Sequence, residues 1–318
     1  MLSRAAVVAA ICVALGNVGA SAQHPGAAVT IASEAARIEK DKATLGDQAA
    51  GIADGLARVK DAVSKDRLFF ALDELQEPWT FEASMRWVSA HSAIKTSDQF
   101  SAEWKRVGEP ALGAPSAQRP AAFEAIAASN AVKAPATWRA SLPYSEDAGM
   151  NAGLYYLAEA QAFTAFASFC RALPLERHGT PVAFKPMGDE ISSLEAEVAA
   201  LYDHASPETK PRFIRVSVGL KIAHTLDEHK DYGAALYQFL AAKYRASVAI
   251  APDVPPGDVK GRLDNARAHL APGVDHSIAE LFLERAAYLL DTKDPSAARS
   301  AGVIADTVLP AYLRLVQR

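Results

Sequence analysis

Apolar residues recur at helical spacing along most of the chain, and prolines interrupt this pattern at intervals. Ile52, Leu56, Val59 and Val63 step by four, three and four residues, which places them on one face of a helix. Residues 236–248 repeat this spacing. The pattern predicts an all-α fold, an irregular stack of antiparallel helix pairs in the form of an α-solenoid or a multi-helix bundle. In a chain of 318 residues, we expect about nine to eleven helices joined by short loops.

One segment fits a strand as well as a helix. In residues 212–222, apolar side chains occupy every second position from Ile214 to Ile222, which is the pattern of a half-buried strand. Apolar residues also recur there every three or four positions, and Pro211 suits the first turn of a helix. We favour the helix, because the only other strand-like run in the sequence is the short segment 182–184.

Prolines and capping residues indicate where helices begin and end. The apolar pattern of residues 68–75 runs up to Pro78, where we expect the helix to stop. Thr80 can then cap a new helix. Thr96 and Gln99 have the spacing of a capping box for the helix after that.

The first 22 residues have the organisation of a secretory signal peptide. Arg4 gives a positive start, an apolar run follows from Ala5 to Gly16, and small residues from Ala20 to Ala22 form a cleavage site. A run of about 12 apolar residues is short for a membrane span, which needs about 20. We therefore expect cleavage after Ala22, a periplasmic or secreted protein, and no integral membrane span after cleavage.

Residues 23–107 are expected to form an N-terminal helical segment, and residues 121–318 a region of helix pairs that can form one continuous domain with it. Between them, residues 108–120 contain three prolines and two glycines and are expected to be a linker.

Cysteine usage points to a protein stabilised by packing. Once Cys12 is removed with the signal peptide, Cys170 is the only cysteine, so no intramolecular disulfide can form. Cys170 lies in an apolar helical segment and is expected to be a small buried side chain rather than a reactive thiol. The sequence also lacks any Asn-x-Ser/Thr sequon, which favours a bacterial periplasm over a eukaryotic secretory route.

His224, Asp227 and His229 are the residues that come nearest to a metal site. A helical zinc pair is usually separated by four residues. Here the separation is five, so at about 100° per residue the two imidazoles diverge by about 140° on a regular helix. We therefore expect no metal and no cofactor, and keep these three residues as weak candidates.

The four tryptophans, Trp79, Trp87, Trp104 and Trp138, all lie in the N-terminal half of the chain. Together with basic residues beside them, they can line a groove for a peptide or glycan. The alternative is that they fill the N-terminal core. They are our candidates for a binding surface.

Residues 219–246 resemble a helical hairpin of the tetratricopeptide-repeat type. The residues that carry the resemblance are Ile222, Ala223 and Leu226 on the first helix, and Ala235, Phe239 and Ala242 on the second. Lys230 to Gly233 occupy the turn between the helices. The family prefers tryptophan at the position of Gly219, so the sequence departs from the pattern there. The resemblance implies antiparallel helix pairs that stack irregularly and do not form a regular array.

No motif in the sequence indicates a particular reaction. There is no Gly-x-Ser-x-Gly elbow, no glycine-rich phosphate loop and no Cys-x-x-Cys pair, so we assign no catalytic residue. A net charge of −4 gives no reason to expect nucleic-acid binding. We expect a non-catalytic binding or scaffold protein of the bacterial cell envelope, whose partner is another envelope protein or a peptide. The alternative is a periplasmic hydrolase or metal-dependent enzyme whose site is assembled from distant residues.

Overall fold

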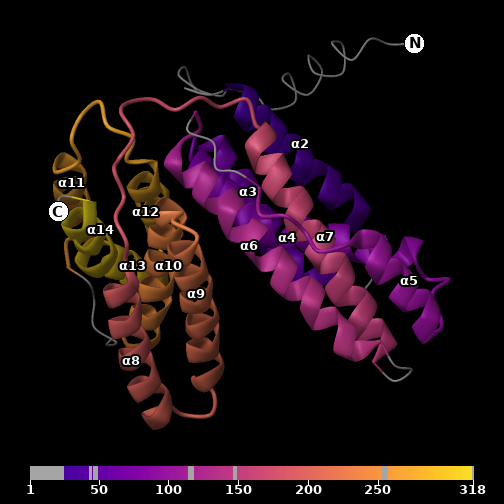
Figure 1. Ribbon diagram of the computed structural model, residues 1–318. Helices are drawn as coiled ribbons and strands as arrows, with labels where there is room; N and C mark the ends of the chain where they lie inside the picture. Colours follow the sequence, from indigo (N-terminus) through magenta and orange to yellow (C-terminus); the bar gives the residue numbers. More distant parts are fainter. Residues whose placement is uncertain are drawn as a thin grey trace, which may run out of the picture.

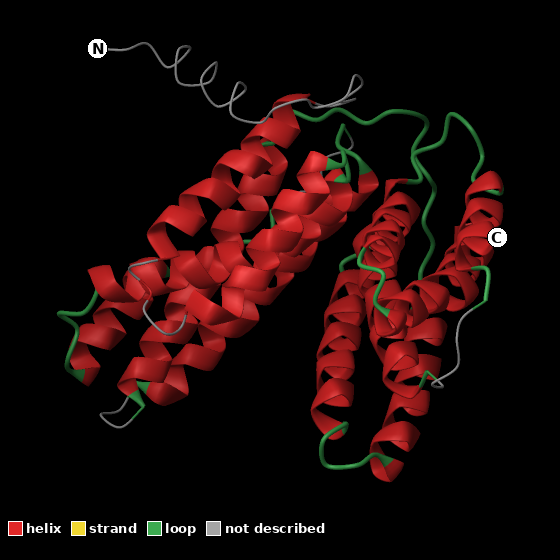
Figure 2. Cartoon of the chain, turned by 180° about the vertical axis from the view of Figure 1, so that it is seen from behind, coloured by secondary structure: helices red, strands yellow, loops and turns green. Residues whose placement is uncertain are grey.

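The computed structural model describes residues 25–42, 45, 49–113, 118–145, 149–251 and 257–316. These residues are 79% helical and form no strand, so the predicted all-α fold of packed helix pairs is confirmed (Figure 2). The signal peptide predicted at residues 1–22 lies outside the described residues. No helix within them is both long and apolar enough to cross a membrane.

The chain forms two helical bundles that lie side by side and are inclined to each other (Figure 1). The first bundle consists of α2 (Pro25–Asp41), α3 (Ala50–Ser64), α4 (Leu68–Ala90), α5 (Ser97–Val107), α6 (Ala121–Ser141) and α7 (Met150–Ala172). In this bundle α6 packs against α7, and α4 packs against α2, α3 and α7.

The second bundle consists of α8 (Gly188–His204), α9 (Lys210–Glu228), α10 (Tyr232–Ile250), α11 (Val259–Ala268), α12 (Ser277–Asp291), α13 (Pro295–Val303) and α14 (Leu309–Val316). A π-helical turn, Ile304–Val308, joins α13 to α14 without a break. With these two counted as one, the described residues contain 12 helices, slightly more than predicted. One helix that was not predicted is α11. Its buried residues are Val259, Leu263 and Ala266, so its apolar pattern is weak in the sequence.

The predicted break at Pro78 is wrong, because α4 continues through it from Leu68 to Ala90. Thr80 caps no helix; it lies inside α4, where its hydroxyl donates a hydrogen bond to the carbonyl of Gln76 (2.8 Å). Pro78 is buried against α3, and a Cβ added to Gly55 would lie 2.8 Å from the proline ring. Burial of the ring between two helices offsets the helical hydrogen bond that proline cannot make.

The contested segment 212–222 is helical and lies within α9. The buried residues of α9 include Phe213, Val216 and Leu220, which follow the helical spacing, whereas Ile214 and Val218 point outward. The strand-like segment 182–184 lies in a loop.

Helices α9 and α10 pack as an antiparallel hairpin, which is the geometry that the resemblance at residues 219–246 implies. Lys230 in the turn adopts a positive φ of 62°, and the carboxylate of Asp231 accepts a hydrogen bond from the N–H of Ala234 (3.3 Å) and caps α10. That these helices belong to the tetratricopeptide-repeat family remains a prediction.

The chain passes from the first bundle to the second through residues 173–187 (Figure 1). The segment 108–120 instead connects α5 to α6 within the first bundle. The bundles meet where α4 contacts α12 and where α6 contacts α9, α10 and α12. A single cluster of buried apolar residues extends through both bundles, so their cores are continuous.

Candidate functional site

A cleft of about 580 Å³ lies between the two bundles. Its volume is within the usual range for sites that hold small molecules or short peptide segments. It is lined by Gln76, Glu77 and Thr80 of α4; Val132, Lys133, Ala136 and Thr137 of α6; Glu159 and Phe163 of α7; and Val218, Lys221, Ile222 and Thr225 of α9. Since its walls belong to different bundles, a ligand in this cleft contacts both of them.

Helical periodicity explains why these residues line the cleft together. On α9, Val218 and Ile222 are four positions apart, as are Lys221 and Thr225, so all four lie on one side of the helix. The opposite side of α9 holds the buried residues that pack into the second bundle. The side of α9 that faces the first bundle is therefore partly polar.

Lys133 is the most unusual residue of the cleft. Its ammonium nitrogen lies 5.4 Å from the centroid of the Phe163 ring, and no carboxylate in the described part of the chain forms a direct ion pair with it. Burial lowers the pKa of Lys133 to about 8, and the positive charge of Arg245 acts in the same direction. The more distant carboxylates of Asp73 and Glu159 oppose this shift. Near pH 8, about half of the Lys133 side chains therefore carry an uncharged amine.

Glu159 lies in the same cleft on the neighbouring helix α7 and is half-buried. Burial raises the pKa of its carboxyl group, while the positive charge of Lys133 acts in the opposite direction. The cleft thus contains an amine that loses its proton more easily than usual, and a carboxyl group that holds its proton more strongly.

Behind the cleft, a polar layer connects the two bundles. The carboxylate of Asp73 accepts hydrogen bonds from the hydroxyl of Tyr237 and from the guanidinium of Arg285. Arg285 also contacts Glu74 (3.1 Å), which in turn pairs with Arg58 (2.5 Å). These contacts hold α4 against α10 and α12, so the wall of the cleft that α4 provides is fixed in position.

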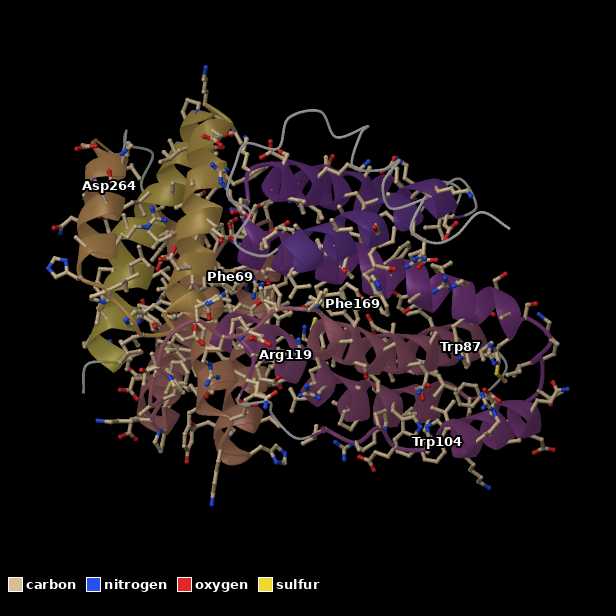
Figure 3. The ribbon with its side chains drawn as sticks, turned by 90° about the horizontal axis from the view of Figure 1, so that it is seen from above. Phe69, Trp87, Trp104, Arg119, Phe169 and Asp264 are labelled. Carbon is tan, nitrogen blue, oxygen red and sulfur yellow. The ribbon has the colours of Figure 1, made fainter. Side chains whose placement is uncertain are left out.

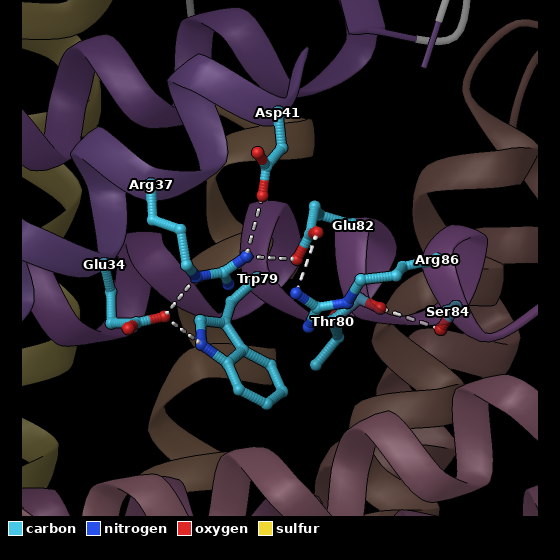
Figure 4. A network of polar contacts seen from close by, with 8 residues as sticks. All are labelled: Glu34, Arg37, Asp41, Trp79, Thr80, Glu82, Ser84 and Arg86. Carbon is cyan, nitrogen blue, oxygen red and sulfur yellow. Dashed lines mark hydrogen bonds and ion pairs between the residues drawn. The ribbon is translucent and has the colours of Figure 1, made fainter. Parts of the chain in front are cut away.

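Trp79 is part of the packing between α2 and α4. It is 8% exposed, contacts Phe166 of α7, and its indole N–H donates to the carboxylate of Glu34 (3.0 Å). Figure 4 shows Trp79 beside a network in which Arg37 bridges Glu34, Asp41 and the buried Glu82. This tryptophan holds α2 on the bundle.

The other three tryptophans gather in a small second core formed by α4, α5, α6 and α7. The rings of Trp104 and Trp138 stack at 3.8 Å, and each indole N–H donates to the carbonyl of the other residue. Trp87 stacks on His91 at 3.7 Å. Figure 3 shows Trp87 and Trp104 toward one end of the first bundle. None of the four tryptophans lines the cleft between the bundles.

The three metal candidates lie near the end of α9 but have different neighbours. His224 pairs with Glu228 (3.3 Å), and both side chains are exposed. The carboxylate of Asp227 instead accepts a hydrogen bond from the N–H of Met187 (2.8 Å), which anchors the start of α8. His229 is exposed at the C-terminal end of α9. Within the described residues, no three His, Cys, Asp or Glu side chains are grouped so that they could hold a metal ion.

Lys133 and Glu159 were not among the residues predicted from the sequence. One signal is present in the sequence, because Lys133 directly follows a mostly apolar run, residues 121–132, and the structure buries every residue of that run. A lysine in such a segment requires a special environment. That Glu159 and α9 provide this environment follows only from the packing of the helices.

No family model, curated protein or solved structure matches this chain.

Proposed function

We propose that this protein is a non-catalytic binding protein that holds a peptide segment of a partner in the cleft between its two bundles. The observation that supports the proposal is an apolar stripe on α9. Ile214, Val218 and Ile222 are spaced four residues apart, and the last two line the cleft. Ile214 and Val218 are 52% and 53% exposed, high values for such side chains.

The stripe extends past the cleft toward the start of α9, and its three residues span about 12 Å along the helix. A compact metabolite bound in the cleft would leave Ile214 uncovered. An elongated ligand with apolar side chains, such as a peptide, covers the cleft and the stripe together.

The charges of the cleft also suit a peptide. Lys133 and Lys221 provide two basic side chains, while Glu77 and Glu159 provide two acidic ones. Such a lining has no strong preference for an anion or a cation, and it offers both donors and acceptors. A peptide backbone presents the complementary groups at regular intervals.

We test this proposal with a displayed peptide library. A peptide selected on the full chain would be labelled with fluorescein, and its affinity would be measured by fluorescence anisotropy. Replacing Val218 with glutamate places a charge on the apolar stripe, and we expect a loss of about 1.5–3 kcal/mol, or about ten- to 150-fold in Kd.

Val29→Glu is the matched control, because Val29 is an exposed valine on α2, which contributes no residue to the cleft. Its affinity for the peptide should equal that of the unmodified protein. If no peptide is selected, or if Val218→Glu binds the selected peptide normally, the proposal is wrong.

We also propose that the protein acts in the bacterial cell envelope, supported by the signal-peptide pattern of residues 1–22. The protein isolated from its source organism should then begin at Gln23, which intact-mass measurement detects. Recovery with residues 1–22 attached would contradict this location.

A further inference from the structure

We propose that Lys133 binds a carbonyl compound, an aldehyde or ketone, covalently as an imine, and that Glu159 transfers the proton that this reaction requires. This activity goes beyond the holding of a peptide in the cleft. It rests on Lys133, Glu159 and the residues that surround them, and not on the apolar stripe of α9.

The environment of Lys133 differs from that of lysines that stabilise this fold. Lys65 pairs with Asp61 (2.9 Å), and Lys260 pairs with Asp264 (2.5 Å). Lys133 instead lies over the Phe163 ring and faces the cleft without a direct ion pair among the described residues. Half-buried ammonium groups are normally paired, because removing a charge from water is costly. An unpaired lysine in an accessible cleft is thus better suited to react with a ligand than to support the fold.

Charged groups on every neighbouring helix act on this amine. Asp73 of α4 and Glu159 of α7 favour the ammonium form, whereas burial and Arg245 of α10 favour the neutral amine. Lys221 of α9 and Glu77 of α4 also line the cleft. Because burial has the largest effect, the pKa of Lys133 falls to about 8. About a tenth of the molecules therefore carry a nucleophilic amine at pH 7, far more than for an ordinary lysine.

Lys133 and Glu159 together supply the amine and the proton that imine formation requires. The neutral amine nitrogen attacks the carbonyl carbon, and a proton shift from nitrogen to oxygen gives a carbinolamine. Glu159 in its protonated form, which burial favours, donates its proton to the carbinolamine hydroxyl, which leaves as water. The nitrogen lone pair then forms the C=N bond. The products are a protonated imine, one water molecule and the carboxylate of Glu159, and no atom is oxidised or reduced.

The test is reductive trapping on the full chain. The protein is incubated at pH 7.5 with a limiting amount of benzaldehyde, a small apolar aldehyde, together with cyanoborohydride. The hydride converts any imine to a stable benzylamine, which peptide mapping by mass spectrometry locates. We expect benzylation of Lys133 to be at least about tenfold faster than that of Lys221, which lines the same cleft but is solvent-exposed.

Two variants make the result decisive. Lys133→Arg should abolish the fast labelling, and its circular dichroism spectrum shows whether it folds. Glu159→Gln keeps the shape of the side chain but cannot donate a carboxyl proton, so labelling of Lys133 should slow by about tenfold or more while that of Lys221 stays unchanged. Labelling of Lys133 no faster than that of Lys221 would overturn the proposal. Fast labelling that Glu159→Gln does not slow would overturn the role of Glu159.

Discussion

Asp275 is the carboxylate whose removal we expect to weaken the junction between the bundles most. It is 4% exposed and precedes α12. One carboxylate oxygen accepts hydrogen bonds from the N–H of Ala121 (2.9 Å) and from Nε of Arg177 (3.0 Å), and the other accepts from the N–H of Ser277 (3.1 Å). A single side chain therefore joins the starts of α6 and α12 to the segment between the bundles.

The expected cost of Asp275→Ala follows from these contacts. A hydrogen bond to a charged group contributes about 1.5–3 kcal/mol, and buried donors that lose their acceptor add a desolvation penalty. Removing one partner of a buried ion pair typically costs about 3–5 kcal/mol. Because the three hydrogen bonds share one carboxylate, their contributions are not additive, and we expect a loss of about 3–5 kcal/mol rather than the full sum of three bonds.

Urea unfolding followed by far-ultraviolet circular dichroism measures this loss as a lower midpoint at an unchanged slope. Asp264→Ala is the control, because Asp264 (Figure 3) forms an exposed ion pair with Lys260 and its removal should cost less than about 0.5 kcal/mol. If Asp275→Ala loses less than about 1 kcal/mol, the contacts of Asp275 do not hold the junction.

Three further predictions concern single sites. Cys170 is buried, which raises the pKa of its thiol, so a thiol reagent should label Cys170 only after the protein unfolds; rapid labelling of Cys170 in the folded protein, located by peptide mapping, would contradict this. Burial raises the pKa of Glu284 from 4.5 to about 8, so this group favours the folded state at low pH and loses that contribution as the pH rises from 4.5 to 8. In urea titrations across this window, Glu284→Gln should lessen the decline in unfolding free energy, and an identical decline in both proteins would refute the assignment. In α3, Gly55→Ala should destabilise the folded protein by about 1–3 kcal/mol, because the new Cβ would lie 2.8 Å from Pro78. Gly51→Ala has open space around it and should stabilise the folded protein by about 0.5–1 kcal/mol. Thermal melts that show the same shift for both variants would contradict this packing.

Local features of the fold were readable from the sequence because they depend on residues a few positions apart. Thr96 and Gln99 form the predicted capping box at the start of α5, and both of its hydrogen bonds are present. The helical spacing in residues 212–222 outweighed the alternation that suggested a strand, since no partner strand exists within the described residues. Cys170 is buried, as its apolar neighbours in the sequence indicated.

Predictions from neighbouring residues were wrong where contact with a helix distant in the sequence stabilised another conformation. Proline normally ends a helix, yet Pro78 lies inside α4 because α3 presents Gly55 at the point of contact. Thr80 was predicted to cap a helix because threonine is a preferred residue at the N-cap position. In the folded chain it bonds to the carbonyl of Gln76 in its own helix.

The sequence by itself determined that this chain is helical and, for helices such as α3 and α10, which residues are buried, because these properties follow from the period of the apolar residues. The tertiary structure decided that α6 and α7 pack with α4, that the chain changes bundle at residues 173–187, and that α9 faces α4 and α6 across a cleft. It also gave Lys133 and Glu159 their altered pKa values. Burial and the field of distant charges cause these shifts, and neither depends on the neighbours of a residue in the sequence.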